Sequence, residues 1–217
     1  MTTTPTLQSI VGGLSYAKGH GTGNDFVLIS DPADEHRLEA EQVAALCDRH
    51  RGIGADGLIR AVPSSSLAEG RAVLETSPEA YWFMDYRNGD GSVSEMCGNG
   101  VRVFVHFLLS EKLVELPVGE QLAIGTRAGV KLVTRLEDGY AVDMGPWEFI
   151  FEQAAMQNGL DSKVSTAGLG NARGALSISM GNPHTVVALA NEGELENLEL
   201  FAIPEVQPLP PHGTNVE

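Results

Sequence analysis

The pattern of apolar and polar positions consists of short apolar runs separated by turns, with one longer run that is apolar on nearly every side. Apolar runs bounded by glycine, proline, asparagine or aspartate are typical of strands. They predict strands at residues 14–18, 26–30, 58–62, 81–84, 122–126, 130–135, 140–144, 175–180 and 185–190. The longer run, 101–109, follows a glycine-rich turn. Because a helix that is apolar all round is buried, this run predicts a helix in the interior.

A second helix is predicted at residues 39–50, where Val43, Leu46 and Cys47 fall at helical spacing. Residues 63–70 are expected to form a loop. Strands and helices do not alternate regularly along the chain, which disfavours a doubly wound parallel sheet. The order favours an α+β fold in which sheets curl around a buried helix.

Length and charge limit the classes of partner. A chain of 217 residues is long enough for one large domain or two small ones. Its net charge of −15 argues against nucleic acid or an anionic membrane, because both bind basic surfaces. Residues 1–13 read as a loose polar tail without the features of a secretory signal, and no apolar run approaches membrane-spanning length. The expected location is therefore the cytoplasm.

The two cysteines have different sequence contexts. Two cysteines do not make a disulfide framework, and the low count fits a reducing compartment. Cys47 occupies a core-spaced position inside a predicted helix, where a cysteine acts as a small apolar residue. Cys97 lies in a glycine-bracketed turn at the start of the buried helix. Unpaired N–H groups and the helix dipole favour an anion there, so Cys97 is a candidate thiolate base or nucleophile.

Five asparagines stand in glycine-rich or proline-rich turns. They are Asn24, Asn88, Asn99, Asn182 and Asn215. Turn formation alone is the ordinary explanation for each one. Five of them together suggest a further role, because neutral amides can bind both the amino and the carboxylate group of a zwitterion.

The histidines and the remaining motifs narrow the chemistry. His20 and His184 lie in the same glycine-rich and proline-rich turns, and His106 follows Arg102 on one helix face. No cysteines or histidines have metal-ligand spacing, so no metal site is expected. No serine stands in a Gly-x-Ser-x-Gly elbow. A cysteine hydrolase would need His20 or His184 within hydrogen-bond reach of Cys97, and this alternative is disfavoured because the Gly-Asn-Gly context suits anion binding better.

Five motifs in series resemble the diaminopimelate epimerases. They are GHGTGNDF at 19–26, RGIGADG at 51–57, MDYRNGDGSVSEMCGNGVR at 84–102, MGNPH at 180–184 and HGTNVE at 212–217. They span nearly the whole chain in the family's order. The resemblance implies an epimerase that needs no cofactor and interconverts LL- and meso-diaminopimelate for lysine and peptidoglycan synthesis.

The resemblance also implies the architecture and the roles of residues. It implies two similar domains, residues 14–139 and 140–217, each a curled, mostly antiparallel sheet around a central helix, with the site in the cleft between them. Cys97 matches one of the family's two catalytic cysteines, and Gly98 and Asn99 match its N–H donors at the helix start. The substrate-binding asparagines match Asn24, Asn88, Asn182 and Asn215. The expected partner is a small amino acid, and a homodimer is possible.

The sequence departs from the family pattern in two places. Gly57 stands where some members carry a side-chain amide. The family's second catalytic cysteine, in a Cys-Gly-Thr-Gly turn, has no match in these 217 residues. The second domain is therefore expected to be incomplete, and the chain to be part of a longer gene product. Intact-mass analysis tests this, because an active native protein of 23.1 kDa contradicts it.

Two other functions remain open at this point. A non-catalytic binding protein on the same scaffold is compatible with a single well-placed cysteine. A racemase acting on proline or hydroxyproline would share the scaffold, although the asparagine of CGNG and the GTGNDF motif favour diaminopimelate.

Overall fold

Two sheets organise the chain in the computed structural model, which describes residues 13–211 and 213–217. The chain divides between Met144 and Gly145 into unit 1, up to Met144, and unit 2, from Gly145 to Glu217. A seven-stranded sheet lies in unit 1, and a six-stranded sheet lies in the described part of unit 2. All but the last residue of the predicted polar tail, 1–13, lie outside the described residues.

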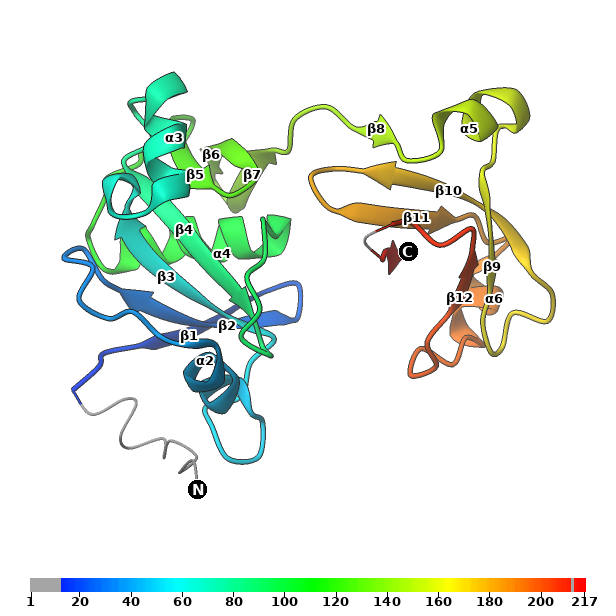
Figure 1. The fold of residues 1–217 in the computed structure, drawn as a ribbon, viewed down its shortest axis with the longest axis horizontal. Helices are drawn as coiled ribbons and strands as arrows, with labels where there is room; N and C mark the ends of the chain where they lie inside the picture. Colours follow the sequence, from blue (N-terminus) through cyan, green and yellow to red (C-terminus); the bar gives the residue numbers. More distant parts are fainter. Residues whose placement is uncertain (1–12, 212) are drawn as a thin grey trace. The chain divides into compact units, whose positions relative to one another are not determined.

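The strands of unit 1 follow one another across the sheet in chain order (Figure 1). They are β1 (Ala17–Gly21), β2 (Asn24–Ser30), β3 (Gly57–Pro63), β4 (Trp82–Asn88), β5 (Gln121–Thr126), β6 (Gly129–Leu136) and β7 (Gly139–Asp143). The pairs β2–β3 and β4–β5 are parallel, and the other pairs are antiparallel. Each parallel pair needs a crossover, which the chain makes through a helix.

Helix α4 (Gly98–Ser110) forms the centre of unit 1. Its apolar side chains, including Val101, Phe104 and Leu108, are completely buried against one face of the sheet. Both edge strands, β1 and β7, contact this helix, so the sheet curls around it. The structure thus confirms the buried helix that the apolar run predicts.

Two further helices cover the opposite face of the sheet (Figure 1). Helix α2 (Ala40–Cys47) confirms the predicted helix at 39–50 and is shorter. The expected loop at 63–70 is wrong, because a 3₁₀ turn η1 (Ser64–Ser66) and helix α3 (Ala68–Thr76) begin there. Only Gly70 and Val73 of α3 are buried, so the apolar periodicity is too sparse to reveal this helix from the sequence.

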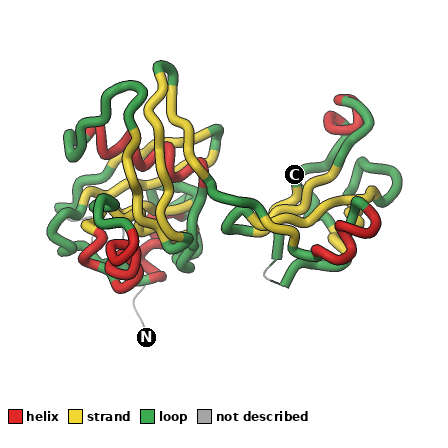
Figure 2. The backbone as a smooth tube through the Cα atoms, turned by 90° about the horizontal axis from the view of Figure 1, so that it is seen from above, coloured by secondary structure: helices red, strands yellow, loops and turns green. Residues whose placement is uncertain are grey.

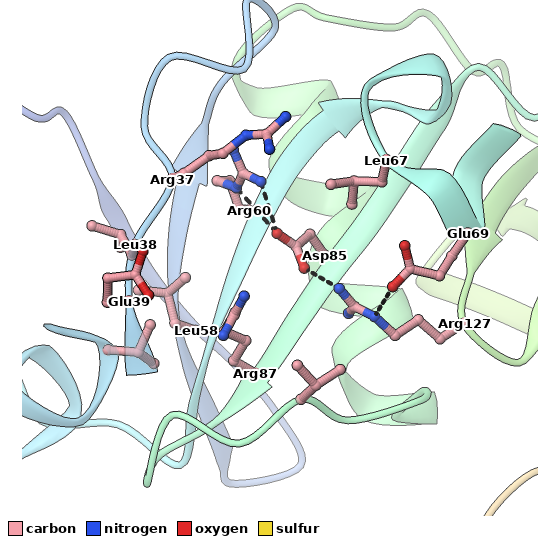
Figure 3. A pocket seen from close by; sticks show the side chains of 12 residues that line it. Arg37, Leu38, Glu39, Leu58, Arg60, Leu67, Glu69, Asp85, Arg87 and Arg127 are labelled. Carbon is pink, nitrogen blue, oxygen red and sulfur yellow. Dashed lines mark hydrogen bonds and ion pairs between the residues drawn. The ribbon is translucent and has the colours of Figure 1, made fainter. Parts of the chain in front are cut away.

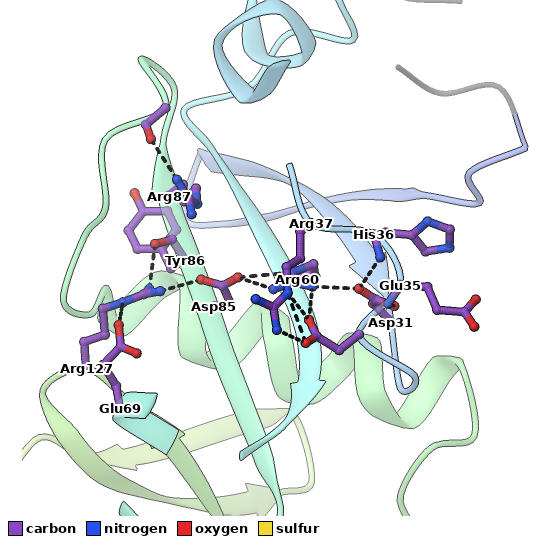
Figure 4. Close-up of polar contacts among 12 residues, drawn as sticks. Asp31, Glu35, His36, Arg37, Arg60, Glu69, Asp85, Tyr86, Arg87 and Arg127 are labelled. Atoms are coloured by element: carbon purple, nitrogen blue, oxygen red, sulfur yellow. Dashed lines mark hydrogen bonds and ion pairs between the residues drawn. The ribbon is translucent and has the colours of Figure 1, made fainter. Parts of the chain in front are cut away.

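A buried ion network crosses the same outer face (Figure 4). Arg60 on β3 donates hydrogen bonds to Asp85 at 3.0 and 3.1 Å, to Asp31 at 2.7 Å and to Asp34 at 2.7 Å. Arg127 donates to the second oxygen of Asp85 at 2.6 Å. The Arg60, Asp31 and Asp85 side chains are at most 6% exposed, so these charges depend on one another for solvation.

Unit 2 is built on a smaller sheet with short helices (Figure 2). Its strands are β8 (Glu148–Phe149), β9 (Ser162–Ser165), β10 (Arg173–Ser179), β11 (Pro183–Val187), β12 (Glu205–Gln207) and β13 (Asn215–Val216). Only β11–β13 is parallel. The helices are α5 (Glu152–Asn158) and α6 (Glu192–Glu196). The described residues of unit 2 thus contain no counterpart of the long helix α4.

The fold is therefore α+β, with two curled, mostly antiparallel sheets, as the sequence predicts.

An apolar cavity of about 270 Å³ in unit 2 is lined by Val164, Val187 and Val216 of the sheet and by leucines from 189 to 200. Within the described ranges, no helix is both long and apolar enough to cross a membrane.

Candidate active site

Cys97 is the residue immediately before helix α4. Its backbone is extended, with φ −140° and ψ 120°, and its carbonyl oxygen accepts the first helical hydrogen bond from the Val101 N–H at 2.9 Å. The N–H groups of the first turn, which includes Gly98 and Asn99, have no partner within the helix. The thiol therefore lies beside backbone donors and the positive end of the helix dipole, and it is half-buried.

The hairpin between β1 and β2 brings Asn24 to this helix start. The turn residues Thr22 and Gly23 have φ values of 52° and 88°, which is typical of tight hairpins. The Cys97 thiol donates to Asn24 Oδ1 at an Sγ···O distance of 3.6 Å. Thr22 Oγ1 donates to Asn99 Oδ1 at 3.0 Å, and Arg102 donates to the same oxygen. Three of the predicted site residues, Asn24, Cys97 and Asn99, thus lie together.

A second layer of charged residues supports Asn24. Its amide nitrogen donates to Asp56 Oδ2 at 3.1 Å, and Arg49 donates to Asp56 Oδ1 at 2.7 Å and to Asp25 Oδ1 at 2.8 Å. Lys18 completes the group with an ion pair to Asp25 at 3.1 Å. The hydrogen bond from Arg49 holds the pKa of Asp25 well below its usual range, and that from Lys18 adds to this effect despite partial burial. Asp25 is therefore a fixed anion at neutral pH.

These charged residues were not singled out from the sequence. Asp25 and Asp56 lie in two of the glycine-rich motifs: Asp25 is the second residue of strand β2, and Asp56 directly precedes strand β3. Because β2 and β3 are parallel and pair Phe26 with Gly57, the two aspartates lie side by side. The order of apolar runs along the chain does not show that β2 and β3 pair. The only hint in the sequence is that an aspartate stands at the same place in both motifs.

Asn88 and Gly57 occupy the facing ends of two strands. Asn88 is paired with Gly57 across β3 and β4, and its amide nitrogen donates to Ser92 Oγ at 3.0 Å. A Cβ atom at Gly57 would lie 2.6 Å from the Arg87 carbonyl oxygen and 2.6 Å from a Tyr86 ring carbon. Tyr86 and the strand backbone therefore fill the space that a side chain at Gly57 would need.

Replacing Gly57 with alanine should destabilise unit 1 by about 1–3 kcal/mol, the usual cost of overpacking a core. The Arg87 carbonyl belongs to a paired strand and cannot move aside easily. Urea unfolding followed by circular dichroism measures the effect. Gly139→Ala is the matched control, because a Cβ atom there meets no atom within 4 Å. Equal stability of the two variants would contradict the packing argument.

The two site asparagines of unit 2 lie around the start of strand β11. Asn182 Oδ1 is 2.9 Å from His184 Nε2, and His184 Nδ1 is 2.7 Å from a carboxylate oxygen of Glu217. Asn215 on β13 pairs with His184 in the strand register and donates to the Pro183 carbonyl oxygen at 3.2 Å. In unit 2, the structure thus brings Asn182 and Asn215 together at the start of strand β11. His184 orients Asn182 there.

The remaining candidates lie elsewhere in unit 1. Cys47 is buried among apolar side chains between α2 and the outer face of the sheet. Burial raises the pKa of its thiol to about 11, and the charge of Asp25 adds to this, so Cys47 stays protonated near neutral pH. His106 is exposed, and its Nδ1 is 3.0 Å from the Tyr140 hydroxyl. Among the described residues, no three His, Cys, Asp or Glu side chains gather as a possible metal site.

A polar cavity of about 270 Å³ lies on the outer face of the unit 1 sheet (Figure 3). Arg60, Asp85 and Arg127 line it, together with Glu69, which accepts from Arg127 at 3.1 Å. These side chains point toward one another and are joined by ion pairs. These charges neutralise one another within the fold, so the side chains that line the cavity form a structural ion network. Cys97 is not among the residues that line it.

Comparison with solved structures defines the class of fold. Over 86% of this chain and 62% of the other, the structure resembles one of Pseudomonas aeruginosa described as a predicted epimerase, with a TM-score of 0.54 and 14% identity. Similarity to a Bacillus anthracis phenazine biosynthesis protein of the PhzF family covers 86% of this chain and 58% of the other, with a TM-score of 0.51 and 19% identity. The chain thus has the fold of PhzF-type and epimerase-type proteins.

Sequence comparison identifies the family. The family model for diaminopimelate epimerase matches residues 16–150. The chain is 43% identical to the diaminopimelate epimerases of Rhodococcus opacus and Thermobifida fusca, over 94% of its own length and 70% of theirs. The chain belongs to the diaminopimelate epimerase family.

Proposed function

We propose that the protein acts on diaminopimelate as an epimerase, interconverting its LL and meso forms without a cofactor, as a step in lysine and peptidoglycan synthesis. The observation that supports this most strongly is the position of Cys97, which lies at the start of α4 with Asn24 and Asn99 beside it. Membership of the family supports the choice of substrate. The substrate, the activity and the roles of Asn88, Asn182 and Asn215 in binding are parts of this proposal.

The proposed chemistry is a proton transfer at the α-carbon. The Cys97 thiolate takes the α-proton, which leaves a thiol on the protein and a carbanion on the substrate. Without an electron sink, this carbanion is stabilised by electrostatics, and we assign donation to the substrate carboxylate to the N–H groups of Gly98 and Asn99. Return of a proton to the opposite face inverts the centre, whereas return to the same face restores it with a solvent-derived hydrogen.

Inversion needs an acid on the face opposite Cys97. The other cysteine of the 217 residues, Cys47, is buried in an apolar cluster, and its thiol has a raised pKa. We therefore assign one of the two thiols of a two-base mechanism to Cys97 and none to Cys47. A chain that acts with Cys97 alone should exchange the α-hydrogen of one stereoisomer without inverting it.

Loss of the α-hydrogen signal in deuterium oxide, followed by proton NMR, tests the proposal. The panel should contain LL-, meso- and DD-diaminopimelate, proline and hydroxyproline. We expect exchange at a diaminopimelate centre and none with proline or hydroxyproline. Exchange of proline alone would assign a proline-type racemase instead. No exchange with any amino acid would favour the non-catalytic binding protein.

The proposed setting follows from charge and substrate. The net charge of −15 disfavours nucleic acid and anionic membranes as partners, so we propose a small amino acid as the ligand and the cytoplasm as the location. We also propose that the protein forms a homodimer. Light scattering after size-exclusion chromatography tests this last point, and a mass equal to one chain at all concentrations would exclude it.

A further inference from the structure

We infer that Asp56, held by Arg49, is a positioning residue that fixes the amide orientation of Asn24 and through it the hydrogen of the Cys97 thiol. The inference rests on the proposed function for its catalytic meaning, because it concerns the same thiol. The geometry that carries it is a continuous set of hydrogen bonds from Arg49 through Asp56 and Asn24 to Cys97.

Hydrogen bonds to both carboxylate oxygens fix the orientation of Asp56. One carboxylate oxygen accepts from Arg49 at 2.7 Å, and the other accepts from the Asp25 N–H at 3.0 Å. The Asp56 N–H itself donates to the Asp25 carbonyl oxygen at 3.0 Å. Arg49 also donates to both carboxylate oxygens of Asp25, at 2.8 and 3.2 Å. The Asp56 carboxylate is thus held from two sides at the start of strand β3.

The Asp56 carboxylate in turn determines which way the amide of Asn24 faces. An ionised carboxylate can only accept hydrogen bonds, so the Asn24 group that faces Asp56 must be the NH₂. The observed Nδ2···Oδ2 distance of 3.1 Å agrees with this. The amide is planar and carries its oxygen on the other side. The carbonyl oxygen of Asn24 therefore faces the Cys97 sulfur, at 3.6 Å.

The Cys97 sulfur lies between groups that favour different protonation states. A carbonyl oxygen accepts a hydrogen bond from a thiol, but a thiolate has no hydrogen with which to make that bond. The N–H groups at the start of α4 act in the opposite sense, because they favour the thiolate. We call the hydrogen-bonded series of Arg49, Asp56, Asn24 and Cys97 the relay. The charged groups in and beside it are Lys18, Arg49, Asp25 and Asp56, two cations and two anions. The orientation of the Asn24 amide thus affects whether Cys97 is stabilised as the thiol or as the thiolate.

Asp56→Asn should reverse this arrangement. Arg49 has only donors, so it will attract the oxygen of the new amide and leave its NH₂ facing Asn24. Asn24 would then turn its oxygen toward residue 56 and its NH₂ toward the sulfur. A donor in place of an acceptor favours the thiolate, so Cys97 should react faster with iodoacetamide. Quantitative mass spectrometry of the peptide containing Cys97 reports this rate and excludes any signal from Cys47.

A double-mutant cycle separates the relay from the lost charge. Asp56→Asn removes an anion near Cys97 and would favour the thiolate through the field alone, with or without Asn24. The rates should therefore be compared in the wild-type and Asn24→Ala backgrounds, where coupling appears only if the two residues act together. We expect the acceleration to be at least about threefold larger when Asn24 is present, the scale of one hydrogen bond.

Two further variants make the result decisive. Asp138→Asn carries the same charge change at an exposed turn of unit 1 and should leave the rate unchanged. Asp56→Ser enters the same cycle in case Asp56→Asn does not fold, which thermal unfolding will show. Equal acceleration in both backgrounds, or none, would overturn the relay. The readout needs no substrate, so its failure is separate from failure of α-hydrogen exchange with diaminopimelate.

Discussion

Replacing Cys97 with alanine should reduce α-hydrogen exchange of diaminopimelate by at least about 10³-fold, within the range contributed by a general acid–base group. The substitution removes the sulfur at the start of α4. It leaves the backbone donors of the first turn in place, because the first helical hydrogen bond uses the Cys97 carbonyl oxygen. Proton NMR in deuterium oxide gives the rate, and circular dichroism shows whether the fold is kept.

Cys47→Ala is the matched control for this prediction. Cys47 is 4% exposed and packs with Val43 and Leu46 on the outer face of the sheet. Its truncation should cost about 1 kcal/mol of unfolding free energy and little activity. If Cys97→Ala kept a substantial rate, or if Cys47→Ala lost exchange while remaining folded, Cys97 would not be the group that moves the proton.

Replacing Arg60 with methionine should destabilise unit 1 by about 3–5 kcal/mol, the cost of leaving buried charges without their partner. Arg60 is the shared donor for Asp31, Asp34 and Asp85, and the carboxylates of Asp31 and Asp85 are almost completely buried. Methionine fills a similar volume, so lost packing contributes little. Urea unfolding measures the change in free energy.

Arg37→Met is the matched control, because Arg37 also pairs with Asp34 but its side chain is 65% exposed. Water solvates that side chain, so its loss should change stability far less than the loss of Arg60. Equal losses of stability in Arg37→Met and Arg60→Met would contradict the role assigned to burial.

The network also sets a pH dependence. Burial raises the pKa of Asp31, but hydrogen bonds from Arg60 and from the backbone of His36 and Glu35 outweigh it, so this pKa lies below its usual value. An aspartate of lowered pKa stabilises the folded state above about pH 3.9, its pKa in the unfolded chain. This contribution is lost as the pH falls through the lower folded value. The loss of folding stability on acidification should be smaller in the Arg60→Met variant than in the wild type.

The parts of the fold that the sequence predicts are those with strong local signals. The run after Cys97 is apolar on nearly every side, which specifies a buried helix. Gly98 and Gly100 follow Cys97 and belong to the first turn of that helix. The position of Asn24 and Asn99 in turns makes them candidates, and both lie beside Cys97 in the structure. Local chemistry was enough to find the centre of the site in unit 1.

The parts that escaped prediction depend on how strands pair. Arg60 stands inside an apolar run, and its three acidic partners come from distant segments that only the sheet brings together. Asp56 lies 32 residues from Asn24 and meets it because β2 and β3 are parallel. Helix α3 buries too few apolar residues to show a period. Such features depend on tertiary contacts, and a single sequence does not show which distant residues come into contact.

The central claim is that the Cys97 thiol moves the α-proton, and progressive modification of that thiol tests it most directly. The protein should be treated with increasing amounts of iodoacetamide, from less than one equivalent to an excess. The modified fraction of Cys97 is measured by mass spectrometry, and the α-hydrogen exchange of diaminopimelate is measured on the same samples. We predict that the exchange rate falls in proportion to the unmodified fraction and reaches zero when Cys97 is fully modified, and that diaminopimelate slows the modification. Full modification of Cys97 with exchange retained would contradict the account.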